Sequence, residues 1–117
     1  MRLVVRDKRL YIAYLVLDTV CSGNKYLREA LRRWGNGASK FKAGKLAVIL
    51  RREDPVLYET ALQFFEVADA RELGKLVWAI VKAKLKSIGV ETNKFETVGD
   101  LCREIPRLKQ AVFSVRP

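Results

Sequence analysis

The stretch that most constrains the fold is 69–89, with the sequence DARELGKLVWAIVKAKLKSIG. It opens with Asp69 and, three residues later, Glu72, a pairing that satisfies unpaired amide groups at the start of a helix. It closes on Gly89 after a lysine-rich final turn, where cations suit the negative end of the helix dipole. The pattern predicts a single long helix over 69–89.

Apolar residues cover more than half the circumference of this helix when placed about 100° apart. They are Leu73, Leu76, Val77, Trp78, Ile80, Val81, Ala83, Leu85 and Ile88. The remaining edge carries Lys75, Lys82 and Lys86 and is expected to face solvent. Because a helix of this kind must be covered on most sides, we expect an all-α fold, a compact bundle of about five helices around 69–89.

The rest of the chain divides into shorter elements. An apolar run over 7–21 suits either a buried strand or a helix capped by Asp7, and its length favours the helix. A clean amphipathic helix is predicted over 25–34, and LAVILRR at 46–52 is either the end of a helix or a short strand. Residues 2–5 and 111–115 are candidates for a small ribbon that joins the two ends of the chain.

Proline punctuates the second half. Asp54-Pro55 predicts a helix start, because proline is favoured at the first helical position. We expect that helix to turn Val56, Leu57, Leu62, Phe64, Phe65 and Val67 largely inward. A short helix over 97–105 is expected to stop at Pro106.

Length and composition indicate one domain, 1–117. Of the 117 residues, 50% are hydrophobic and 31% charged, which is typical of a folded protein. No apolar run reaches the roughly 20 residues that span a bilayer, and Asp7, Lys8 and Arg9 interrupt any signal peptide. We therefore expect no membrane partner and a cytoplasmic location. Scarce Asn, Gln and Met beside abundant charge resemble hyperthermophile usage.

Two cysteines, Cys21 and Cys102, lie far apart and lack the close spacing of a zinc site. The favoured interpretation is that both are small buried apolar residues. A disulfide is the alternative, since proteins inside hyperthermophiles are an exception to the reducing rule.

The positive charge is concentrated in the first half of the chain. Residues 1–53 hold 13 Lys or Arg against 4 Asp or Glu, a net charge of +9, whereas residues 54–117 hold 10 against 9, a net charge of +1. This asymmetry favours a polyanion or an acidic surface as the partner of one side of the molecule.

The candidate phosphate-binding residues are the cations of this basic half. They are Lys25, Arg28, Arg32, Arg33, Lys40, Lys42 and Lys45, with Arg51 and Arg52 at the edge. The first three follow one flank of the predicted helix over about 10 Å, a run that suits a phosphate backbone. Trp34 and Phe41 bracket a glycine loop and offer faces for stacking on unpaired bases, although Trp34 equally fits the apolar side of its helix.

Catalysis has little support in the sequence. With no histidine, the common catalytic triads and histidine-bound metals are excluded. Glu59 and Glu66 share a helix face but fit a solvated surface, and no glycine belongs to a phosphate-binding loop. We expect neither a cofactor nor a metal, and no enzymatic activity.

Residues 54–105 resemble the HEPN superfamily of small helical domains, in particular its archaeal families. The segments that match are LYETALQFFEVAD, RELGKLVWAIVKAKLKSIGVE and FETVGDLCREI. Catalytic members carry an arginine followed by a histidine that cleaves RNA, and this chain has no histidine. The resemblance therefore implies the scaffold, RNA or nucleotide binding and dimerisation, without the ribonuclease activity.

Together these patterns predict a non-enzymatic nucleic-acid-binding protein, with RNA favoured over DNA, or an accessory subunit of a ribonucleoprotein. The alternative is a helical adaptor or self-associating module whose charge meets an acidic protein partner.

Overall fold

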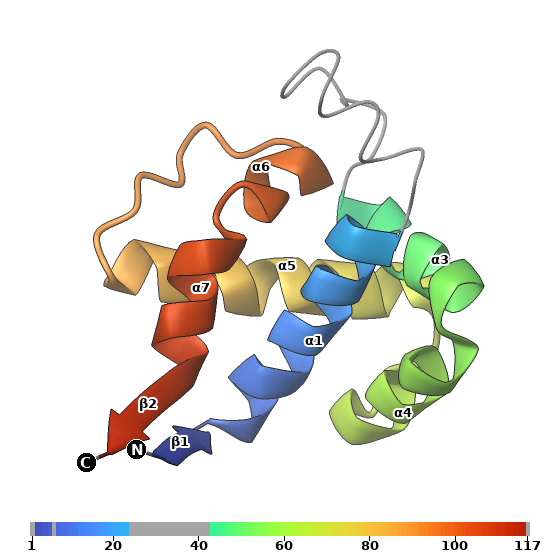
Figure 1. The fold of residues 1–117 in the computed structure, drawn as a ribbon. Coiled ribbons are helices and arrows are strands. Elements are labelled where there is room, and N and C mark those ends of the chain that lie inside the picture. Colours follow the sequence, from blue (N-terminus) through green and yellow to red (C-terminus); the bar gives the residue numbers. More distant parts are fainter. Residues whose placement is uncertain (1, 6, 24–42, 117) are drawn as a thin grey trace.

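The computed structural model describes residues 2–5, 7–23 and 43–116, and in this part of the chain the fold is an all-α bundle with one small ribbon (Figure 1). Six helices and two strands follow in the order β1 Arg2–Val5, α1 Lys8–Gly23, α3 Ala43–Glu53, α4 Pro55–Phe65, α5 Ala70–Ser87, α6 Val98–Cys102, α7 Ile105–Val112 and β2 Phe113–Arg116. The predicted fold class is confirmed. The helix predicted over 25–34 lies outside the described residues.

The ambiguous segment over 7–21 is a helix, and it forms the middle of the core. The Asp7 carboxylate caps α1 by accepting a hydrogen bond from the Leu10 amide at 3.2 Å. The side chains of Leu10, Ala13, Tyr14, Val16, Leu17 and Val20 are all buried. Helix α1 packs against each of the other five described helices and crosses α5 near the middle of the molecule (Figure 1).

Helix α5 begins and ends as its sequence predicts. The Asp69 carboxylate accepts a hydrogen bond from the Glu72 amide at 2.9 Å, and the Glu72 carboxylate accepts one from the Ala68 amide at 3.1 Å. Beyond Ser87 the chain leaves the helix through Gly89, whose φ of 92° lies in the left-handed region that favours glycine.

The prediction that α5 is covered over more than half of its circumference is wrong. The helix buries one stripe, Ala70, Leu73, Gly74, Val77, Val81 and Leu85. Leu76, Trp78 and Ile80 are only half-buried, while Ala83 and Ile88 are exposed. Because α1 takes much of the central position, α5 packs with one side on α1, α3, α4 and α7 and turns the other to solvent.

Helices α3 and α5 pack closely together, and a glycine permits their approach. A Cβ atom on Gly74 would lie 2.4 Å from the carbonyl oxygen of Ala43, which would be a steric clash. Leu46, Ala47 and Leu50 of α3 are fully buried on the same side as this contact. The segment 46–52, which the sequence left open between helix and strand, is part of the helix α3, and the start of α3 packs against Gly74 of α5.

Two predictions for the second half need correction. Asp54 and Pro55 open α4 as expected, with the Asp54 carboxylate accepting from the Leu57 amide at 3.0 Å. However, Val56 and Phe64 are 76% and 41% exposed, because Tyr58, Ala61 and Phe65 form the inward face of α4.

Pro106 does not end a helix over 97–105. It lies in the first turn of α7, after α6 has already ended at Cys102. Proline lacks the amide hydrogen that a helix interior needs, yet it suits a first turn, where amides have no partner inside the helix. The same residue therefore follows one helix and begins the next.

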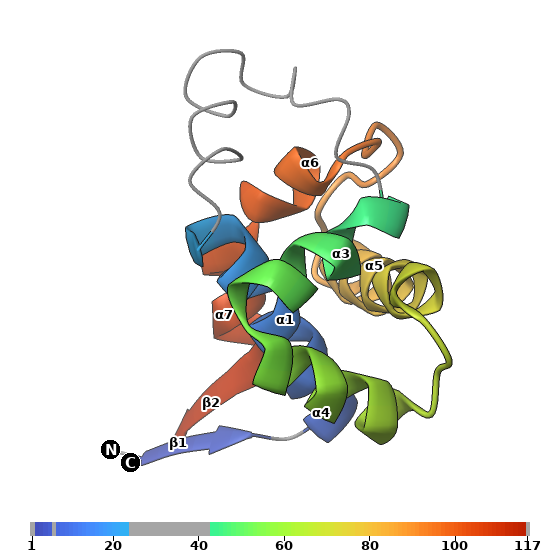
Figure 2. The ribbon, with the colours of Figure 1, turned by 90° about the vertical axis from the view of Figure 1, so that its right-hand side faces the viewer.

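The predicted terminal ribbon is present. Strands β1 and β2 pair antiparallel, with Arg2 opposite Arg116 and Val5 opposite Phe113, and extend from the base of α1 and α7 (Figure 2). The Phe113 ring holds the ribbon to α1 through edge-on contacts with Tyr11 and Tyr14, each with ring centroids 5.8 Å apart.

Cys21 and Cys102 form a disulfide, so the favoured interpretation of two unlinked apolar residues is wrong. The bond joins the last turn of α1 to the end of α6 across 81 residues of sequence, with the two Cα atoms 5.7 Å apart. In the chain-entropy account, closing a loop of this length stabilises the fold by about 4 to 5 kcal/mol. The bond thus ties the short helix α6 to the end of the central helix α1.

We expect Gly74→Ala to lower the free energy of unfolding by about 1 to 3 kcal/mol, because α3 must move to accept the methyl group. Gly44→Ala is the matched control, since its Cβ would meet only Arg71 Cγ at 3.7 Å. The control should leave stability unchanged or raise it by up to about 1 kcal/mol. Urea unfolding of both variants checks this, and equal midpoints would contradict the close contact.

We expect the double variant Cys21→Ala/Cys102→Ala to lose about 2 to 5 kcal/mol of stability, since its unfolded chain is no longer cross-linked. Urea unfolding without reductant measures the loss. Adding reductant to the wild type should bring its midpoint to that of the variant. Identical midpoints for oxidised wild type and variant would show that the bond does not stabilise the protein.

Candidate nucleic-acid interface

Most of the predicted phosphate-binding residues fall outside the part of the chain that the structure describes. These are Lys25, Arg28, Arg32, Arg33, Lys40 and Lys42, together with the predicted stacking residues Trp34 and Phe41. The remaining three cations, Lys45, Arg51 and Arg52, all lie on α3. Among the described residues, the predicted interface therefore consists of three cations on α3.

Helix α3 presents its three cations on one exposed face. Leu46, Ala47, Ile49 and Leu50 are buried toward the core. This leaves Lys45, Arg51 and Arg52 exposed around the half-buried Val48. Lys45 and Arg52 are seven residues apart, so their backbone positions are separated by about 10 Å along the helix.

One of these cations is oriented by an aromatic ring. The Arg51 guanidinium carbon lies 5.9 Å from the centre of the Tyr58 ring on α4, within the range of a cation–π contact. The contact holds the guanidinium beside the α3–α4 junction. Because Tyr58 is itself buried, it provides a fixed base for an exposed charge.

None of these three cations forms an ion pair within the described residues, and Glu53, exposed after Arg52, is the one carboxylate of α3. The one ion pair among the described residues lies away from α3 and joins Arg107 to Glu104 at 3.7 Å. Asp54, which follows α3 directly, has its carboxylate engaged in capping α4. The three cations of α3 therefore carry their charge into solvent, where a field of one sign attracts polyanions.

Sequence reasoning missed Arg71 as a surface cation. It lies in the first turn of α5 and is exposed, and its Cγ atom packs beside Gly44 at the start of α3. The signal was present, because Arg71 precedes Lys75 by four residues and so shares its face. It was overlooked because the solvent-facing edge was defined by lysines alone.

The described residues offer no cluster of metal-binding side chains. They contain no group of three or more His, Cys, Asp or Glu side chains that could hold a metal ion. Glu59 and Glu66 are exposed on α4 and at its end.

Burial, with a smaller effect from nearby Asp18, raises the pKa of the Tyr14 hydroxyl above its usual value of about 10. Tyr14 is therefore an uncharged core residue at neutral pH.

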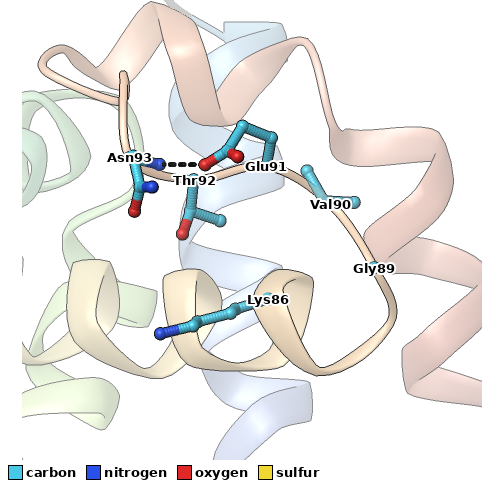
Figure 3. Close-up of a pocket in the computed structure, with 6 residues that line it drawn as sticks. All are labelled: Lys86, Gly89, Val90, Glu91, Thr92 and Asn93. Carbon is cyan, nitrogen blue, oxygen red and sulfur yellow. Dashed lines mark hydrogen bonds between the residues drawn. The ribbon is translucent and has the colours of Figure 1, made fainter.

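A pocket lies between the last turns of α5 and the loop that follows (Figure 3). It is lined by Lys86 and the segment 89–93, and the Lys86 side chain lies along α5 toward the helix N-terminus. The Glu91 carboxylate accepts a hydrogen bond from the backbone N–H of Asn93 at 2.9 Å. One cation and one carboxylate give the pocket no net charge, so it has no preference for a small anion.

None of the helices in the described ranges is long and apolar enough to cross a membrane. Comparison with protein-family models, with curated proteins and with solved structures finds no match for the chain.

Proposed function

We propose that the protein is a non-enzymatic nucleic-acid-binding protein or ribonucleoprotein accessory subunit that contacts phosphates through the nine candidate cations from Lys25 to Arg52. The observation that carries the proposal is the exposed face of α3, where Lys45, Arg51 and Arg52 have no ion-pair partner among the described residues. The preference for RNA over DNA comes from the resemblance to HEPN domains.

Charge distribution supports the proposal. The first half of the chain carries a net charge of +9, and Lys42 directly precedes the first residue of α3 in the sequence. Phosphate contacts by Lys and Arg release counterions from the nucleic acid, and this release supplies most of the affinity in binding without sequence preference. Such contacts need exposed cations and no enclosed pocket, which suits the face of α3.

We expect the triple variant Lys45→Gln/Arg51→Gln/Arg52→Gln to bind RNA more weakly and with less salt dependence. Each lost phosphate contact should lower the slope of log K against log salt by about 0.7 to 0.9. Fluorescence anisotropy with labelled single- and double-stranded RNA and DNA measures the slope. Glutamine keeps a helix propensity close to that of Lys and Arg, so folding is preserved.

The matched control for this variant is Lys8→Gln/Arg103→Gln/Lys109→Gln, which removes three exposed cations from other elements. The control should keep most of the wild-type affinity and slope. Wild-type binding that is absent, or flat between low and moderate salt, would overturn the proposal.

A protein-interaction module is the second candidate, and one observation favours it. Val56 and Phe64 are 76% and 41% exposed on α4, and with Thr60 they follow one another at intervals of four residues. This spacing places all three on one helix face. An acidic protein partner with an apolar patch would suit both this face and the positive charge.

Charge reversal at Arg28 and Arg32 to Glu separates the two candidates. We expect the double variant to lose retention on immobilised RNA, since like charges repel the phosphates. Its size in gel filtration should equal that of the wild type. A change of oligomeric size with RNA retention intact would favour the interaction module instead.

A further inference from the structure

Helix α5 carries a second basic surface, in the half of the chain whose net charge is only +1. Arg71, Lys75 and Lys86 are exposed and Lys82 is half-buried. At about 100° per residue these four positions fall within about 60° of one another around the helix axis. They extend over 15 residues, or about 22 Å at 1.5 Å per residue, and we refer to them as the α5 strip.

Small side chains lie beside the α5 strip. Ala79 and Ala83 are exposed on the same side of the helix, where solvent-facing helix positions usually carry long polar side chains. Trp78 lies at the strip's other edge and is half-buried. Two alanines beside the cations allow an extended chain to approach the helix closely, and the partly exposed Trp78 side chain offers it an apolar contact.

Charges within the α5 strip repel one another. Arg71 with Lys75, and Lys82 with Lys86, are like-charged pairs four residues apart, an arrangement that destabilises a helix. The described residues contain no ion pair that relieves this repulsion. The nearest carboxylate in sequence, Glu72, accepts a hydrogen bond from the Ala68 amide and is drawn toward the start of the helix.

Because no ion pair within the described residues relieves the repulsion along the strip, we infer that the α5 strip binds a nucleic-acid backbone, with its four cations contacting phosphates along one strand. The inference rests on the proposed function and extends it to the second half of the chain. At 3.4 Å per nucleotide along a duplex strand, the strip spans about six or seven nucleotides. Phosphate contacts of this kind position a strand and read no bases.

The test compares Lys75→Gln/Lys82→Gln/Lys86→Gln with the control Lys8→Gln/Arg103→Gln/Lys109→Gln, which removes the same number of charges from exposed positions elsewhere. Binding is measured by anisotropy with a labelled 20-nucleotide RNA, single-stranded in one arm and duplex in the other, from 50 to 300 mM salt. We expect the α5 variant to bind about 100- to 1,000-fold more weakly at 0.1 M salt and its salt slope to fall by about two to three. Its thermal midpoint should equal or exceed that of the wild type, since like-charge repulsion is removed.

The outcomes separate the two claims. If the α5 variant binds as the control does while the wild type shows steep salt dependence, the α5 strip is not part of the interface and the proposed function stands. If the wild type does not bind either RNA, the proposed function fails and the inference fails with it. A weaker α5 variant with unchanged thermal stability supports the inference.

Discussion

The structure depends on the contact between α3 and α5 at Gly74. With no side chain at this position, the Ala43 carbonyl approaches the α5 backbone more closely than a Cβ atom would allow. This contact fixes the first residues of α3 against α5. Arg71 and Gly44 lie side by side at the same junction, so one contact determines how the basic face of α3 sits beside the start of the α5 strip.

Around this junction the fold separates apolar and basic surfaces. Helix α1 fills the middle, and α3 and α5 cover it with one side each, which leaves both with a solvent-facing side rich in Lys and Arg. The acidic residues nearby serve the backbone instead. Asp54, Asp69 and Glu72 accept hydrogen bonds from amides at helix starts. Helix capping thus directs these carboxylates to backbone amides, and none of them forms an ion pair with the cations within the described residues.

Local features of the fold could be predicted from the sequence, and features that depend on distant partners could not. The helix starts predicted at Asp54 and Asp69 are confirmed, because a helix cap involves residues only three positions apart. The exposure of Val56, Phe64 and Ile88 was misjudged, because periodicity shows which residues are apolar and not which side a neighbouring helix covers. The pairing of Cys21 with Cys102 depends on how α1 meets α6, which their spacing does not contain.

The candidate site was predictable to a similar degree. Lys45, Arg51 and Arg52 were correctly expected at the surface, since charged residues are rarely buried without a partner. Arg71 was missed, and the α5 lysines were expected to face solvent but were not counted among the candidate phosphate-binding residues, which were taken from the basic half 1–53. Charge acts through space, and the fold places the strip of a nearly neutral half next to the basic helix α3.

The most direct test of the central claim is to recover the protein under native conditions at low salt and identify what accompanies it before and after nuclease treatment. A protein whose surface charge serves phosphate binding should be recovered with nucleic acid, and nuclease or high salt should release it. Recovery with a protein partner that nuclease leaves in place, or without any nucleic acid, would contradict the account.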